Sequence, residues 1–157
     1  NTALDRARYF MAIRTLELDL HFAQFEIWDE GAGRDPGDPA RDAFERGFVA
    51  SHSFLSVLAR GDGRACVSLE FLEHKPVASL TGWERAFEVS LHFPQGRFQV
   101  HESAGSAVEA FSTRPGWARF RVQERPSSRG SADREFSIQV WPSPEAAPEQ
   151  LLPNGAV

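Results

Sequence analysis

Cysteine, lysine and long apolar runs are almost missing from this chain of 157 residues. The single cysteine, Cys66, can form no internal disulfide and cannot build a cysteine-based zinc site alone. No stretch reaches the roughly 18 consecutive apolar residues of a membrane-spanning helix, so no contact with a membrane is predicted. The N-terminus lacks the apolar run of a signal peptide, and we expect a cytoplasmic protein.

Basic charge is also scarce. The chain carries 17 basic and 22 acidic residues, which leaves a net charge of −5. Because nucleic-acid-binding domains usually carry a basic surplus, direct binding of nucleic acid is disfavoured. Hydrophobic residues make up 41% of the chain and include 13 Phe and 4 Trp, which is enough for a globular domain with a real core.

Apolar and polar residues alternate along much of the chain, with the period typical of β-strands. The alternating segments are Leu16–Phe22, Phe25–Ile27, Val67–Phe71, Phe87–Phe93, Phe98–Val100, Ala118–Val122 and Phe136–Val140, and the mainly apolar segment Phe54–Ala59 is expected to be a buried strand. About seven or eight such strands predict a mainly β fold, an antiparallel β-sandwich with one short helix. We expect a single domain over residues 1–142 and a disordered Pro-rich tail over residues 143–157.

Two connections between strands can be predicted in more detail. The parity of the apolar positions shifts at residues 23–24, which predicts a β-bulge there. Residues 87–93 and 98–100 flank a short Gly-containing turn and predict a β-hairpin within one sheet. In that register Phe93 lies directly opposite Phe98, and all the apolar side chains share one face.

One segment has the pattern of a helix. Asp38 followed by Pro39 predicts a helix start, with an N-cap residue and then proline at the first helical position. Phe44 and Phe48 lie four residues apart, so they are expected to share one face of this short helix.

Sequence motifs of enzymes are missing. There is no G-x-S-x-G, no phosphate-binding Gly-rich loop and no H-E-x-x-H, and Ser51-His52-Ser53 has no identifiable acidic partner. The predicted hairpin makes His92 and His101 diagonal neighbours, which could form a metal pair or be two solvated histidines. We favour solvated histidines and an inert Cys66 thiol, and we predict a protein that is not an enzyme and needs no cofactor.

Negative charge is concentrated in one stretch. It contains seven acidic residues opposed by Arg34 and Arg41, and seven minus two gives five net negative charges, equal to the surplus of the whole chain. The seven are Glu26, Asp29, Glu30, Asp35, Asp38, Asp42 and Glu45.

Three interpretations of this stretch remain open. It can be a solvated loop in which Asp38 caps a helix. It can be a surface complementary to a basic protein, such as the DNA-binding cleft of a nuclease. A calcium site ranks last, because the spacing does not match a D-x-[DN]-x-[DN]-G loop.

The order of several motifs resembles a known family. The motifs are F-A-Q-F-E-I-W-D (Phe22–Asp29), A-F-E-R-G-F-V-A (Ala43–Ala50), W-E-R-A-F-E-V (Trp83–Val89), P-G-W-A-R-F-R-V (Pro115–Val122) and E-F-S-I-Q-V-W-P (Glu135–Pro142). Together they resemble the competence protein J family of small bacterial proteins, over roughly residues 16–142. The resemblance implies a role as inhibitor of a nuclease that acts during DNA uptake.

Charge and resemblance together predict an inhibitor or immunity-type protein that binds a nuclease, a toxin or another basic protein. A β-sandwich module that binds a small ligand or a metal ion is the alternative. The predicted partner-binding residues are the acids of the stretch, with Trp28 as a possible apolar anchor at its edge. They are Trp28, Asp29, Glu30, Asp35, Asp42 and Glu45.

Overall fold

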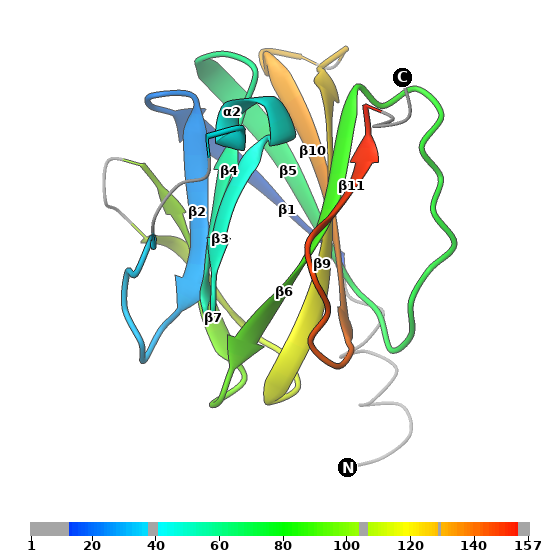
Figure 1. Ribbon diagram of the computed structural model, residues 1–157. Helices are drawn as coiled ribbons and strands as arrows, with labels where there is room; N and C mark the ends of the chain where they lie inside the picture. Colours follow the sequence, from blue (N-terminus) through cyan, green and yellow to red (C-terminus); the bar gives the residue numbers. More distant parts are fainter. Residues whose placement is uncertain (1–12, 38–40, 104–106, 129, 154–157) are drawn as a thin grey trace.

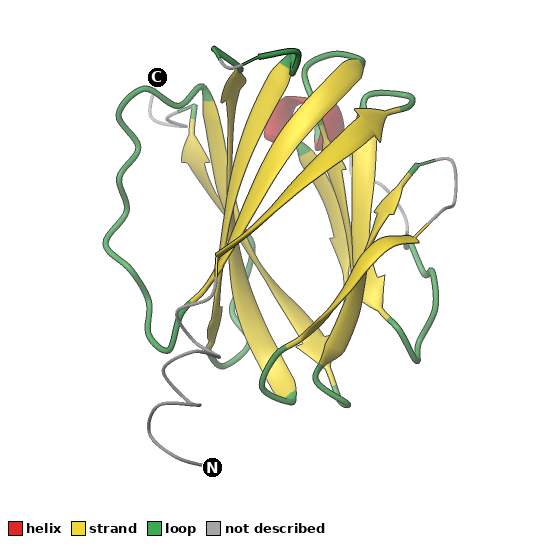
Figure 2. Cartoon of the chain, turned by 180° about the vertical axis from the view of Figure 1, so that it is seen from behind, coloured by secondary structure: helices red, strands yellow, loops and turns green. Residues whose placement is uncertain are grey.

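Two β-sheets pack face to face in the computed structural model, and the short helix α2 (Ala43–Arg46) lies at one end of them (Figures 1 and 2). The structure describes residues 13–37, 41–103, 107–128 and 130–153. The six-stranded sheet has the order β1 (Ile13–Leu20), β5 (Gly63–Phe71), β10 (Arg134–Pro142), β9 (Gly116–Pro126), β6 (Arg85–Phe93) and β11 (Glu149–Leu152). The five-stranded sheet has the order β3 (Phe48–Ser51), β4 (Phe54–Leu58), β2 (Gln24–Asp29), β7 (Arg97–Glu102) and β8 (Ala107–Ser112).

The predicted β-sandwich is confirmed, and the described residues form eleven strands. The sequence pattern misses β3, β8 and β11, which are short and have no clean alternation of buried and exposed residues. Strands β5 and β10 pair in parallel, whereas the other pairings between described strands are antiparallel.

Phenylalanine rings fill much of the space between the sheets. Phe98 of β7 lies with its ring centroid 5.1 Å from that of Phe93, 5.4 Å from Phe111 and 5.6 Å from Phe120. Because complete burial of such a side chain contributes about 1.5–3 kcal/mol, this cluster accounts for a large part of the stability of the sandwich. The many phenylalanines in the sequence are therefore mainly a property of the core.

The parity shift at residues 23–24 marks a passage between the two sheets, so the predicted bulge is wrong. Phe22 and Ala23 have positive φ angles of 58° and 52°, and they form a tight turn that an isolated bridge between His21 and Gln24 closes. The turn carries the chain from β1 in one sheet to β2 in the other.

The predicted hairpin over residues 87–100 is wrong for the same reason. Strand β6 pairs with β9 and β11, whereas β7 pairs with β2 and β8 in the opposite sheet. Phe93 and Phe98 meet as predicted, but they stack across the core instead of side by side on one sheet. As a consequence, His92 and His101 lie in different sheets and cannot be diagonal neighbours.

Charged side chains are buried on the outer face of the six-stranded sheet. The carboxylate of Glu88 accepts hydrogen bonds from Arg119 at 3.2 Å and Arg121 at 2.9 Å. Carbonyl groups of the covering segments complete this cluster: Pro76 accepts from Arg121, and residues 146–147 accept from Arg119. Buried charges are tolerated when they are paired and hydrogen-bonded in this way.

The C-terminal stretch is ordered against this face. Strand β11 pairs with β6 (Figure 1). The side-chain amide of Gln150 donates to the carbonyl of Arg46 at 3.2 Å. The prediction of a disordered tail is therefore wrong for residues 143–153, while residues 154–157 lie outside the described part. The proline-rich composition does not show that the free edge of β6 and the Arg119 guanidinium would hold this stretch.

Candidate partner-binding surface

The acidic segment, defined as residues 29–45, crosses the outer face of the five-stranded sheet. Beneath it lie the outward side chains of β2 and β4, among them Glu26, Phe54 and Ser56. The described parts of the segment therefore pack against the five-stranded sheet. Their local geometry decides which of their charged side chains reach the surface.

The first turn of the segment uses its predicted binding residues as structural supports. Asp29 is only 3% exposed, and its carboxylate accepts a hydrogen bond of 2.7 Å from the backbone N–H of Ala32. Trp28 is half-buried, and its ring stacks on the imidazole of His101 with centroids 3.9 Å apart. Both side chains hold the turn that presents the rest of the segment.

A part-buried ion pair removes another carboxylate from the surface. Arg34 reaches back to Glu26 on β2, and its guanidinium donates to the two carboxylate oxygens at 2.9 and 2.8 Å. The hydrogen bond and the charge of Glu26 raise the pKa of Arg34 above its ordinary value, and partial burial opposes this shift. This pair ties the loop to the sheet.

The exposed acids are Glu30, Asp35, Asp42 and Glu45. Glu30 pairs with Arg97 at 3.1 Å, and Asp42 pairs with Arg46 at 3.2 Å, both in solvent. Such exposed pairs are weak and leave their carboxylates able to bind another partner. Asp38 lies outside the described residues, so the predicted helix start at Asp38-Pro39 does too.

Phe44 occupies a different position from the one predicted. Helix α2 ends at Arg46, because Gly47 adopts a left-handed conformation with φ 95° and its N–H donates to the carbonyl of Ala43. Phe48 therefore enters β3 and is buried, whereas the Phe44 side chain is 80% exposed. The predicted shared helical face of Phe44 and Phe48 therefore does not exist.

A small, mainly apolar cleft opens beside Phe44. It has a volume of about 230 Å³ and lies between the acidic segment and the outer face of the five-stranded sheet. Its lining comprises Gln24, Glu26, Arg34, Pro36, Gly37, Ala43, Phe44, Val49, Phe54, Ser56 and Leu58. An apolar hollow beside exposed acids is suited to an apolar side chain from a protein surface that also carries basic residues.

The helix is anchored to the interior by one arginine. Arg85 on β6 donates to the carbonyl of Phe44 at 3.0 Å and also to the carbonyl of Leu58. Its guanidinium pairs with the buried carboxylate of Glu124 at 2.6 Å. The exposed Phe44 side chain is therefore carried on a backbone that is tied to both sheets.

The predicted His92–His101 pair does not form, because the two residues belong to different sheets. Within the described ranges, no cluster of three or more His, Cys, Asp or Glu residues is placed to hold a metal ion. Cys66 is half-buried. No helix in the described part of the chain has the length and apolar character needed to cross a membrane.

These features define a β-sandwich that carries an acidic, aromatic surface. The chain is similar in structure to ComJ from Bacillus subtilis, described as an inhibitor of the DNA degrading activity of NucA. The TM-score is 0.70 at 17% sequence identity, over 85% of this chain and 98% of that chain. The family resemblance that the motifs indicate is thus confirmed at the level of the fold.

A second solved structure, described as crocagin biosynthetic gene J, has a TM-score of 0.46 and 17% identity, covering 85% of this chain and 99% of that chain. No protein-family profile matches the sequence. No curated protein matches it either.

Proposed function

We propose that this protein is a non-catalytic inhibitor or immunity-type protein, which binds a nuclease or another basic protein in the cytoplasm of a bacterium. The fold that it shares with ComJ, an inhibitor of the DNA degrading activity of NucA, supports this proposal. Fold alone does not imply function, so the proposal depends on the surface that the fold carries.

The observation that carries the proposal is the position of Phe44. Its side chain is 80% exposed and stands between Asp42 and Glu45 in the sequence, on a helix that is anchored through Arg85. Aromatic residues, phenylalanine among them, are enriched at the core of protein–protein interfaces. Carboxylates around such an anchor favour a partner with positive charge.

Inhibition of a nuclease requires no catalytic group. A nuclease binds DNA through basic side chains that neutralise phosphates, and a rigid acidic surface can occupy the same basic cleft. In this proposal Glu30, Asp35, Asp42 and Glu45 supply the charge. Trp28 and Asp29, also predicted as binding residues, hold the turn in place.

The decisive test neutralises Asp35 and Glu45, the two exposed acids of the segment that form no ion pair with another described residue. The variant Asp35→Asn/Glu45→Gln is compared with Glu73→Gln/Glu149→Gln, which removes the same charge from elsewhere on the surface. Partners are captured from lysate of the source cells at low and high salt, and the association rate is then measured for the captured protein. We expect association to be slowed several-fold, with weaker salt dependence, only in the first variant.

DNA degradation by the same lysate provides the functional readout. Added wild-type protein should suppress it, and Asp35→Asn/Glu45→Gln should suppress it less at equal concentration. If the two double variants bind and inhibit equally, the acidic segment is not the interface.

A further inference from the structure

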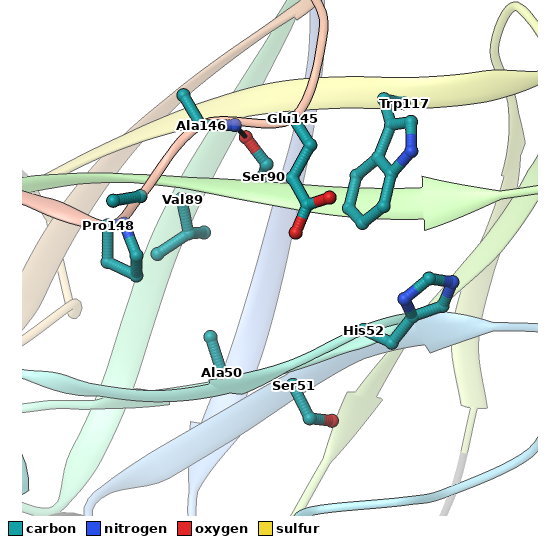
Figure 3. Close-up of a pocket in the computed structure, with 10 residues that line it drawn as sticks. Ala50, Ser51, His52, Val89, Ser90, Trp117, Glu145, Ala146 and Pro148 are labelled. Atoms are coloured by element: carbon teal, nitrogen blue, oxygen red, sulfur yellow. Dashed lines mark hydrogen bonds between the residues drawn. The ribbon is translucent and has the colours of Figure 1, made fainter.

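A second cavity lies at the seam where the two sheets meet. It has a volume of about 530 Å³ and opens between β3 of one sheet and β6 of the other, with residues 145–148 as its outer wall (Figure 3). A volume in this range is large enough for an amino-acid side chain or a small molecule.

Hydrogen bonds close the seam on both sides of this cavity. At one end the N–H of His92 donates to the carbonyl of His52 at 2.9 Å, and the hydroxyl of Ser53 donates to the carbonyl of His92. At the other end Gln150 donates to the carbonyl of Arg46. The cavity thus lies between two points at which hydrogen bonds cross the seam.

Three rings form a wall at the first of these ends. The ring centroids of His52, His92 and Trp117 lie 4.9 Å from one another in each of the three pairs. Figure 3 shows Glu145 beside Trp117, with its carboxylate, the indole and the His52 imidazole converging on the same space. An aromatic face next to a carboxylate is the arrangement that recognises an organic cation.

The charges around the cavity favour a cation. None of the residues that line it in the described part of the chain is Arg or Lys, and the only lining carboxylate is that of Glu145. The nearby Arg119 guanidinium is occupied, because it donates to Glu88, to the Ser90 hydroxyl and to the carbonyls of residues 146–147. An anionic ligand would meet the Glu145 carboxylate without a free guanidinium to compensate it.

The cavity adjoins the acidic segment. The hydroxyl of Ser51, a lining residue, donates to the backbone carbonyl of Asp35 at 2.6 Å. We infer that the cavity is a socket for a guanidinium or ammonium group, namely an arginine or lysine side chain of the protein that the acidic segment binds. This inference rests on the proposed function for the identity of the occupant, and on the cavity itself for its chemistry.

The chemistry can be tested without a partner. Arginine methyl ester is titrated into the full-length protein while the indole N–H signals are followed by NMR, with Trp117→Phe used for assignment. We expect the Trp117 signal to shift and the signals of Trp28, Trp83 and Trp141 to stay in place. Citrulline methyl ester, which keeps the α-ammonium group but has a neutral ureido group in place of the guanidinium, should cause a much smaller shift.

Glu145→Gln should weaken binding of arginine methyl ester roughly tenfold, because it removes the Glu145 carboxylate from the socket and leaves the Trp117 ring in place. Equal binding of the arginine and citrulline esters, or equal binding to wild type and Glu145→Gln, would overturn the inference.

The same Glu145→Gln variant is then tested for binding to the partner protein that is captured through the acidic segment. Glu145→Gln should weaken its binding by a similar factor. If Asp35→Asn/Glu45→Gln weakens that complex and Glu145→Gln does not, the proposed function stands and the socket assignment fails. If no partner depends on the acidic segment but arginine methyl ester still binds, the proposed function fails, and the cavity is a site for a free cationic ligand.

Discussion

The carboxylates of the acidic stretch that the structure describes have very different environments. Glu26 is buried against Arg34, and one carboxylate oxygen of Asp29 closes a turn by accepting a hydrogen bond from the backbone N–H of Ala32. Glu30 and Asp42 have exposed arginine partners. The local charge of −5 counted from the sequence therefore overstates the field that a partner would meet. Pairing of side chains from distant strands decides which charges remain available.

The residue-scale prediction concerns Phe44. Phe44→Ala should weaken binding of the captured partner by about 2 kcal/mol, roughly 30-fold, because it removes the apolar anchor of the surface. The melting temperature of the Phe44→Ala variant should equal that of the wild type, because the Phe44 side chain is 80% exposed and contributes little to the core.

Val77→Ala is the control for this measurement. Val77 is 93% exposed on the segment that covers the other sheet. Calorimetry of both variants would give the result, and equal affinities for Phe44→Ala and Val77→Ala would exclude Phe44 as an anchor.

At the scale of elements, the connections decide how similar strand patterns are used. The turn at residues 22–23 and the turn between β6 and β7 both move the chain from one sheet to the other. The alternation of apolar residues in the sequence is the same whether two strands pair within one sheet or face each other across the core. For this reason the strands themselves were predictable, whereas the bulge and the hairpin were predicted wrongly.

The element-scale prediction concerns the end of helix α2. A Cβ atom at Gly47 would lie 2.5 Å from Nε of Arg85, and the φ of 95° is itself unfavourable for alanine. Gly47→Ala should lower the free energy of unfolding by about 2–4 kcal/mol, because it combines backbone strain with displacement of a buried, paired guanidinium.

Gly33→Ala separates these two causes. Gly33 also has a positive φ, of 73°, but nothing lies near its would-be Cβ, so only about 1 kcal/mol should be lost. Urea unfolding measures both variants. Similar losses would show that Arg85 does not hold the helix as the structure indicates.

At the scale of the whole molecule, the C-terminal stretch completes the six-stranded sheet. Strand β11 covers the free edge of β6, and residues 146–147 supply acceptors to the buried Arg119. The same stretch forms the outer wall of the seam cavity. Stability and the proposed cation socket therefore depend on a segment whose composition suggests disorder.

Removal of this segment tests its role. A chain that ends at Pro142 should lose about 2–4 kcal/mol of unfolding free energy, since Arg119 loses buried acceptors and the edge of β6 is uncovered. A chain that ends at Pro153 keeps β11 and should match the wild type. Urea titrations followed by tryptophan fluorescence would show this difference, and equal midpoints for both chains would contradict the packing of the tail.

The sequence by itself determined the fold class, most strand positions and the inward faces, because burial imposes a period of two on any strand that has one apolar side. Its motifs also indicated the fold shared with ComJ. Only the tertiary structure decided which sheet each strand joins, which carboxylates are buried, and that Phe44 faces solvent. These outcomes depend on contacts between residues far apart in the chain, such as Arg85 with Phe44 and Glu124, and no local pattern encodes them.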